Sequence, residues 1–259
     1  MNTKKKLAES TSDVVKTGPA GVLTERPDFL KKGGTAGREN ITAEDITLPR
    51  LEMVQALSEA WQEGKPGFVP GAKVGDLVNS VTKDVYPRPV LFIPVQFVKQ
   101  FNIWKLRKFG GGFMGTYSNH AEAQTELAQR VPPAEFDQYE ILDTPVFYGL
   151  IPVFEGEDMI DVHRISISMP RTKAKHARRL NSLIDMTHED AYNRVYAIST
   201  VEDRNKQNQE FRNLSIDQLG YPNEEMVVAA EAFYAQIKRG VKVKVDQSGA
   251  TDDAPTTEY

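Results

Sequence analysis

Cysteine is absent from this sequence of 259 residues, and tryptophan occurs only twice. The absence of cysteine excludes disulfide bonds, thiolate zinc sites and cysteine nucleophiles, and it is typical of proteins from a reducing compartment. No apolar run reaches 18 residues, and residues 1–13 carry lysines and polar residues instead of the apolar core of a signal peptide. We therefore expect a soluble, cytoplasmic protein without membrane contact.

The motifs of metal and nucleotide chemistry are also missing. None of the four histidines has a second histidine at i+4, and no G-x-x-x-x-G-K-[ST] loop is present. One acidic turn could hold a magnesium ion, although a solvated turn is the simpler interpretation: Glu155, Glu157, Asp158 and Asp161. The sequence predicts a protein that is not an enzyme and has no cofactor and no metal, with a magnesium-dependent nuclease as one alternative.

Charge is unevenly distributed along a chain whose net charge is −4. The segment from residue 164 to residue 179 holds no acid and six basic residues, which are Arg164, Arg171, Lys173, Lys175, Arg178 and Arg179. Residues 246–259 hold four acids and no base. A mean charge near zero therefore conceals one basic segment and one acidic tail.

The composition divides the chain into three segments. Residues 1–45 mix Lys, Gly, Pro, Ser and Thr without a sustained period, which predicts a flexible arm. Residues 46–244 are apolar enough to form one α+β domain, and residues 245–259 form an acidic tail. Both ends are expected to be disordered.

Within the domain, Val90–Lys105 gives the strongest strand signal, and Pro94 predicts a bulge or an edge position there. Further strands are expected at residues 139–154, 160–169, 191–201 and 211–219. Helices are expected at residues 48–57, 119–131, 172–186 and 224–239, with Asn119 and Asn223 as N-terminal caps. We expect an OB-like, partly open antiparallel β-barrel with peripheral helices.

The strand around residues 95–107 carries the first signal for nucleic acid. Alternation places rings and cations on one side, namely Phe97, Lys99, Phe101, Ile103, Lys105 and Arg107. Such a surface suits single strands, because bases stack on rings while cations follow the phosphates. Core packing of Phe97, Phe101 and Ile103 is the alternative. Trp104 is expected as an exposed ring beside Lys105, Arg107 and Lys108.

The helix expected after Pro170 carries the second signal. At 100° per residue one arc of this helix presents Arg171, Lys175, Arg178 and Arg179. Cations in a first turn oppose the helix dipole, and no acid on this face balances them. Two interpretations of this basic face are therefore open: it binds nucleic acid, or it is simply a solvated face of the helix.

The tail carries the third signal, in Asp252, Asp253, Glu258 and Tyr259. Such a tail can fold back onto a basic groove and mimic phosphates, or it can offer its terminal ring and carboxylate to a protein partner. An ordinary mobile terminus is the alternative interpretation.

Several short segments resemble a family of tailed-bacteriophage single-stranded DNA-binding replication proteins. They are Leu48-Pro-Arg-Leu-Glu-Met-Val-Gln-Ala-Leu, Gly75-Asp-Leu-Val-Asn, Ile103-Trp-Lys with Gly110-Gly-Gly-Phe, and Tyr196-Ala-Ile-Ser-Thr-Val-Glu-Asp-Arg-Asn. The resemblance implies an OB-type barrel and a tail that recruits phage replication proteins. It also implies the host cytoplasm as the location.

Our hypothesis from the sequence is a non-catalytic protein that coats single-stranded DNA during phage replication or recombination. Its acidic tail would serve autoregulation or partner recruitment, and homo-oligomers are left open. A structural or virion-associated phage protein is the second candidate. The magnesium-dependent nuclease is the third.

Overall fold

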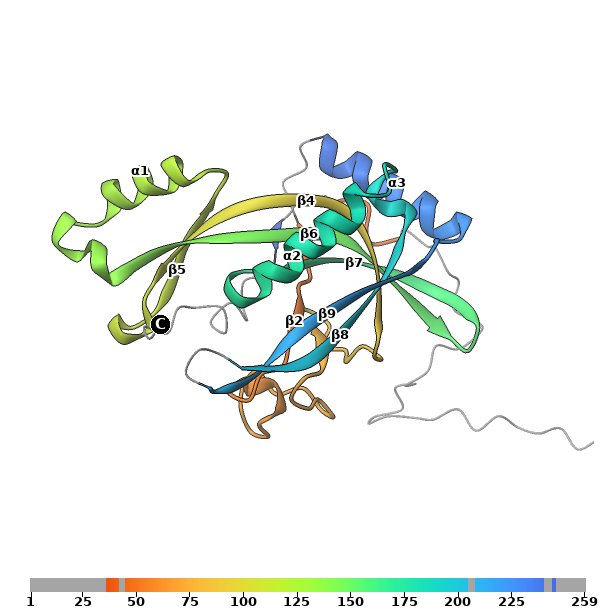
Figure 1. Cartoon of the computed structure of the whole chain (residues 1–259), viewed down its shortest axis with the longest axis horizontal. Coiled ribbons are helices and arrows are strands. Elements are labelled where there is room, and N and C mark those ends of the chain that lie inside the picture. Colours follow the sequence, from red (N-terminus) through yellow and green to blue (C-terminus); the bar gives the residue numbers. More distant parts are fainter. Residues whose placement is uncertain (1–35, 42–44, 205–207, 240–243, 246–259) are drawn as a thin grey trace, which may run out of the picture. The chain divides into compact units, whose positions relative to one another are not determined.

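The computed structural model describes residues 36–41, 45–204, 208–239 and 244–245 (Figure 1). Contacts divide the chain into two units between Ile41 and Thr42, and all the helices and strands described here belong to the second unit. Most of the expected arm and residues 246–259 of the expected tail lie outside the described residues.

Six strands form one antiparallel sheet. Five of them follow the order β7-β6-β4-β8-β9, and β5 pairs with β4. Their bounds are β4 (Val90–Lys105), β5 (Gly112–Tyr117), β6 (Tyr139–Glu155), β7 (Asp158–Ser168), β8 (Val195–Arg204) and β9 (Glu210–Gly220). In the described part of the chain β7 and β9 do not pair with each other, so the sheet is not a closed barrel. The α+β class with mostly antiparallel strands is confirmed, and the OB-like topology stays a prediction.

Strand β4 is the centre of this sheet. It pairs with β8 through residues 90–92 and with β6 through residues 93–105, so it is not an edge strand. The register against β6 shifts between Pro94 and Gln96, as in a β-bulge. The bulge expected from Pro94 is therefore found, because a residue without an amide proton is best accommodated where the ladder is interrupted.

Two short strand pairs lie outside the main sheet. Strand β2 (Leu51–Met53) pairs with β3 (Leu77–Asn79), and β1 (Thr47–Leu48) runs parallel to β10 (Lys244–Val245). The helix expected over residues 48–57 is thus wrong: residues 51–53 form a strand, and residues 54–57 form no helix. Leu51 and Met53 are buried, whereas Glu52 between them is only partly buried. This alternation is typical of a strand, and it arises because these residues pair with the distant strand β3 although their spacing resembles that of a helix.

The described residues form three α-helices, α1 (His120–Arg130), α2 (Ala174–Asp185) and α3 (Glu224–Lys238). The expected caps are confirmed: the side chain of Asn119 accepts from the amide of Glu122, and that of Asn223 accepts from the amide of Met226. Short 3₁₀ helices complete the structure at η2 (Glu59–Trp61), η3 (Arg107–Phe109), η4 (Pro133–Gln138), η5 (Arg171–Lys173) and η6 (Ala191–Asn193).

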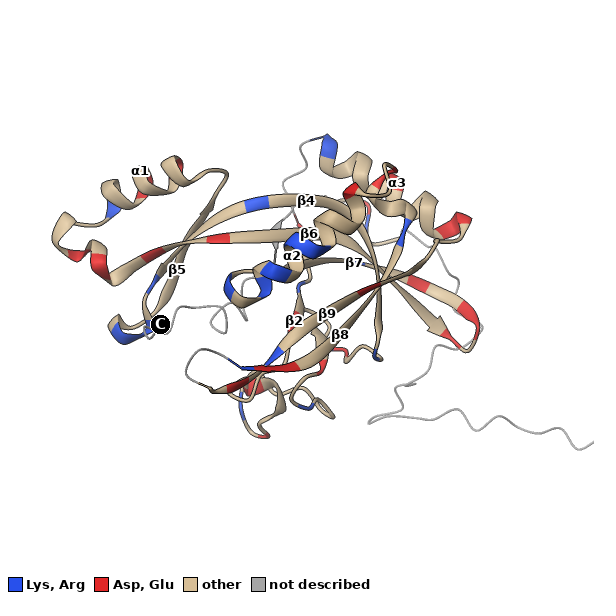
Figure 2. Ribbon diagram, in the orientation of Figure 1, with Lys and Arg blue, Asp and Glu red and all other residues tan. Residues whose placement is uncertain are grey.

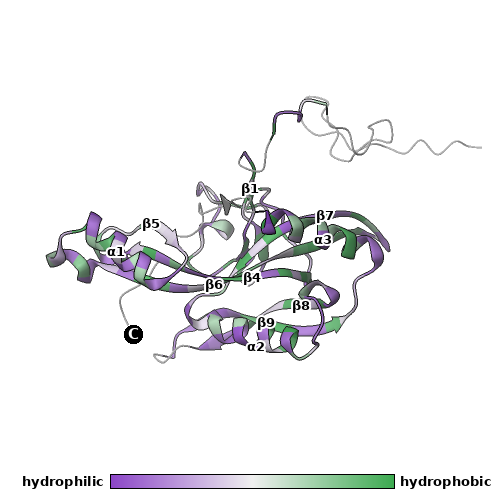
Figure 3. Ribbon diagram, turned by 90° about the horizontal axis from the view of Figure 1, so that it is seen from above, coloured by the Kyte–Doolittle hydropathy of each residue, from purple (hydrophilic) through white to green (hydrophobic). Residues whose placement is uncertain are grey.

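The helices cover different parts of the sheet. Figure 3 shows α2 and α3 on opposite sides of the layer that contains β4 and β6. Neighbouring residues of β6 explain this arrangement, because Phe147 packs in the cluster with Leu180 of α2 whereas Val146 packs with Phe233 of α3. Helix α1 covers Ile103 at the far end of β4.

Candidate nucleic-acid interface

The expected alternation along β4 is present, because its pairing with β6 is continuous from Gln96 to Lys105. The ring of Phe97 is 41% exposed and lies 5.0 Å from the ring of buried Phe147. The ammonium of Lys99 lies 5.5 Å from the centroid of Phe101. Rings and cations therefore do share this face of the strand.

The row is interrupted where α1 packs on the sheet. Ile103 is fully buried against Ala123 and Leu127, and the half-buried rings of Phe101 and Tyr139 pack on the same cluster. Core packing is thus the correct interpretation for Ile103 and part of the explanation for Phe101. Beyond α1 the pattern resumes, since the ammonium of Lys105 lies 5.7 Å from the centroid of Tyr139.

Trp104 does not have the exposed ring that we expected. It is only 3% exposed and packs with Leu142, and its ring lies 5.1 Å from that of Phe113. The residue lies between two neighbouring strands, opposite Phe113 of β5 and opposite Glu140 of β6, so little of the ring faces solvent. Direct stacking of a base on Trp104 is therefore incompatible with this structure.

Two exposed rings that the sequence analysis missed lie next to Trp104. Phe109 and Phe113 are 37% and 38% exposed, and the ammonium of Lys108 lies 4.8 Å from the Phe109 centroid. Arg107 is exposed in the same turn. The Gly110-Gly-Gly run between the two rings is the sequence signal that could have indicated this ring-bearing turn.

The basic helix face is balanced by acids, contrary to expectation. Lys175 lies 2.7 Å from Asp203, and Arg179 lies 3.3 Å from Asp217. Arg171, which η5 places ahead of the helix, pairs with Glu140 at 2.5 Å. The acids come from β6, β8 and β9, so the sequence of the helix alone could not reveal them.

The remaining cations of this segment differ in their surroundings. Lys173 is half-buried within η5, whereas Arg178 is exposed and forms no ion pair with any residue that the structure describes. Exposed pairs such as Lys175–Asp203 contribute only about 0 to 1 kcal/mol each. A phosphate can therefore compete for these cations at a small cost. Figure 2 shows basic residues along α2 and at the turn between β4 and β5.

The ion pair of Arg171 places the basic segment before α2 against β6, on the face of the sheet opposite to Lys105. Its partner Glu140 lies opposite Trp104 in the register and directly follows Tyr139, the ring beneath Lys105. The segment before α2 therefore meets the β4–β6 pair where β6 begins. By alternation Glu140 and Tyr139 project to opposite sides of the sheet, so Arg171 and Lys105 approach it from different faces.

Arg164 is not part of this assembly. It donates to the side chain of Gln236 at 2.8 Å and lies 5.3 Å from the ring centroid of Phe233, both on α3. The tail residues Asp252, Asp253, Glu258 and Tyr259 lie outside the described residues. Within residues 36–41, 45–204, 208–239 and 244–245, no group of three or more His, Cys, Asp or Glu residues could hold a metal ion.

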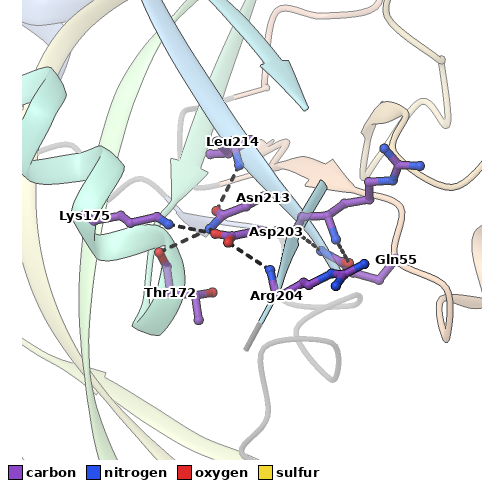
Figure 4. A network of polar contacts seen from close by, with 8 residues as sticks. Gln55, Thr172, Lys175, Asp203, Arg204, Asn213 and Leu214 are labelled. Carbon is purple, nitrogen blue, oxygen red and sulfur yellow. Dashed lines mark hydrogen bonds and ion pairs between the residues drawn. The ribbon is translucent and has the colours of Figure 1, made fainter. Parts of the chain in front are cut away.

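Asp203 is the centre of the polar network that fixes the start of α2 to the sheet (Figure 4). Its carboxylate accepts from Lys175 at 2.7 Å, from the amide side chain of Asn213 at 2.8 Å and from the backbone amide of Arg204 at 2.9 Å. These donors, Lys175 first, lower the pKa of Asp203 from 3.8 to about 2. The ionised carboxylate also offsets the cost of a lysine in the first turn of the helix.

This network predicts a pH-dependent effect of Asp203→Asn. Because the folded-state pKa is lowered, the ionised carboxylate stabilises the fold above its ordinary pKa of 3.8, and this contribution is lost as the pH falls toward about 2. We expect the variant to lose about 1 kcal/mol at neutral pH and much less near the folded pKa. Urea unfolding at both pH values measures the difference.

The matched control is Asp217→Asn, which breaks the ion pair between Asp217 and Arg179. Both side chains of this pair are more than half exposed. We expect this control to change stability by less than about 0.5 kcal/mol at either pH. An equal loss for Asp203→Asn at both pH values would contradict the role of its ionised carboxylate.

The fold defines an α+β protein of mostly antiparallel strands. On its surface, basic side chains either lie over aromatic rings or form ion pairs with acidic side chains. Residues 16–243 match the family model described as Pam3 phage gp34-like protein. The chain belongs to this bacteriophage protein family. The resemblance to phage proteins is thereby confirmed, whereas single-stranded DNA binding stays a prediction. No curated protein and no solved structure matches the chain.

None of the helices that the structure describes is both long enough and apolar enough to cross a bilayer.

Proposed function

We propose that this protein binds single-stranded DNA, without catalysing a reaction on it, during phage DNA replication or recombination. The observation that carries the proposal is a series of three lysine–ring pairs along β4 and η3. They are Lys99 with Phe101, Lys105 with Tyr139 and Lys108 with Phe109, at 5.5, 5.7 and 4.8 Å. Paired cations and rings suit a ligand that alternates phosphates and bases.

The family assignment supports the phage context of this proposal. The central strand, long and bulged at Pro94, supports an OB-like, partly open sheet as the binding surface. The host cytoplasm would be the location. We include the acidic tail in the proposal, for autoregulation or for the recruitment of phage replication proteins.

Titration with a fluorescently labelled oligo-dT at about 50 and about 200 mM salt tests the proposal. We expect log affinity to fall linearly with log salt, by about 0.7 for each phosphate contact. Lys99→Gln, Lys105→Gln and Lys108→Gln together should lower this slope by about 2, because three phosphate contacts are lost. No binding at the lower salt, or equal affinity for duplex DNA, would overturn the proposal.

The matched control replaces two exposed lysines of the loop between β2 and β3, Lys65 and Lys73, with glutamine. Nonspecific attraction falls in this variant as well, but we expect the salt slope to stay within about 0.5 of the wild-type value if these lysines contact no phosphate. A loss of slope similar to that of the triple variant would mean that net charge, not the lysine–ring series, governs binding.

A further inference from the structure

The turn between β4 and β5 combines exposed rings with a sequence that is rich in basic residues. Residues 105–117 include three cations and no acid. We use the name β4–β5 tip for residues 107–113, which comprise η3, three glycines and the first residues of β5. Figure 2 shows that the basic residues here lie at the end of the sheet away from α3. Negative charge on a ligand would meet no repulsion from this segment.

Backbone hydrogen bonds to Leu106 hold the β4–β5 tip in a defined turn. The carbonyl of Leu106, itself buried, accepts from the amides of Phe109 and Gly111 at 2.9 and 3.1 Å. The amide of Leu106 in turn donates to the carbonyl of Gln138 at 2.8 Å. Gly110 has a φ of 100°, a conformation that side chains disfavour, which explains why glycine follows the first ring. The two rings are therefore held in place before a ligand arrives.

The two rings expose a substantial part of their surface although a hydrophobic core is available nearby. The ring of Phe113 rests against Trp104 at 5.1 Å and is still 38% exposed, and Phe109 has Lys108 over its ring. Rings beside cations suit a ligand that offers flat faces and negative charge together. Unpaired nucleotides have this combination, whereas the bases of a duplex keep their faces stacked inside the helix.

We propose that the β4–β5 tip is a base-stacking site, in which unpaired bases stack on Phe109 and Phe113 while Arg107 and Lys108 contact the flanking phosphates. This inference rests on the proposed function and adds to it the position and the kind of contact. The buried ring of Trp104 packs against the ring of Phe113 and does not contact the base.

Trp104 provides a direct readout of this site. Trp61 is the only other tryptophan, so the variant Trp61→Phe leaves Trp104 as the sole indole. Because the Trp104 ring lies 5.1 Å from that of Phe113, a base stacked on Phe113 should change the Trp104 emission. We expect full-length Trp61→Phe protein to show this change in emission on titration with oligo-dT. The emission change should saturate at the same concentration as the anisotropy of a labelled oligo-dT in a parallel titration.

Single leucine variants of the two rings test the contribution of stacking. Phe109→Leu and Phe113→Leu keep an apolar side chain but remove the flat ring, so we expect each to weaken oligo-dT binding by about fivefold or more. The matched control is Phe154→Leu, which removes an equally exposed ring at the acidic turn between β6 and β7. This control should bind like the wild type.

The outcomes separate the two proposals. If the wild type binds oligo-dT but both tip variants bind like Phe154→Leu and the Trp104 emission stays constant, the tip is not the stacking site, and the proposed function stands. If the wild type does not bind oligo-dT, both proposals fail. The Trp104 measurement requires no change in the tip, so it is decisive even where a tip variant folds poorly.

Discussion

Replacing Gly149 with alanine is expected to destabilise the protein by at least about 3 kcal/mol and to lower its Tm by roughly 6 °C or more. Gly149 is a buried residue of β6 that lies opposite Pro94 in the register. A Cβ atom there would come within 2.4 Å of the Ile93 carbonyl oxygen and of two carbon atoms of the Phe92 ring. Backbone cannot yield as a flexible side chain can, so the clash must displace the central strand.

The matched control for this prediction is Gly220→Ala, also at a strand glycine. Among the described residues nothing lies within 4 Å of a Cβ built on Gly220, so we expect a change in stability within about 0.5 kcal/mol. Urea and thermal unfolding followed by circular dichroism measure both variants. A Tm for Gly149→Ala close to that of Gly220→Ala would show that the Phe92 ring does not pack on the backbone of β6.

Features that depend on a few neighbouring residues were predictable from the sequence. Asn119 and Asn223 cap their helices because a short polar side chain can reach an amide three residues later. The bulge after Pro94 follows from the missing amide proton of proline. Both signals act within one turn or one strand, so no knowledge of the tertiary structure is needed.

Features that depend on distant strands were not predictable in the same way. Alternation correctly separates Trp104 from Lys105, but it does not tell which side of the strand is covered. Trp104 is buried because β5 and β6 flank it, and the pairing partner of β2 lies 24 residues further along the chain. A helical spacing at Leu51 could not anticipate that pairing.

The charge balance of α2 was missed for the same physical reason. Lys175 and Arg179 meet Asp203 and Asp217, which approach from the hairpin of β8 and β9. Without the tertiary structure, a helix face that carries only basic residues indicates a binding surface. In the folded protein three of the four basic residues of that face, Arg171, Lys175 and Arg179, pair with acids, so Arg178 and the β4–β5 tip become the more accessible cations.

Leu180→Ala is the second change for which we expect a large effect, a loss of about 2 to 5 kcal/mol. Leu180 is fully buried and is the main contact of α2 with the core, where it shares a cluster with Phe147, Tyr196 and Ile216. Truncation removes apolar contacts and leaves a cavity that the surrounding strands, fixed by their ladders, can fill only in part. The Tm should fall by roughly 5 to 20 °C.

Leu219→Ala makes the same chemical change at an exposed residue of β9 and should alter stability by less than about 0.5 kcal/mol. If Leu180→Ala were as stable as this control, α2 could not be packed on the sheet as described. Because α2 also carries Lys175 and Arg179, loosening it should weaken the ion pairs with Asp203 and Asp217. The stabilising effect of the Asp203 carboxylate should therefore be smaller in the Leu180→Ala background, which a double-mutant cycle with Asp203→Asn measures.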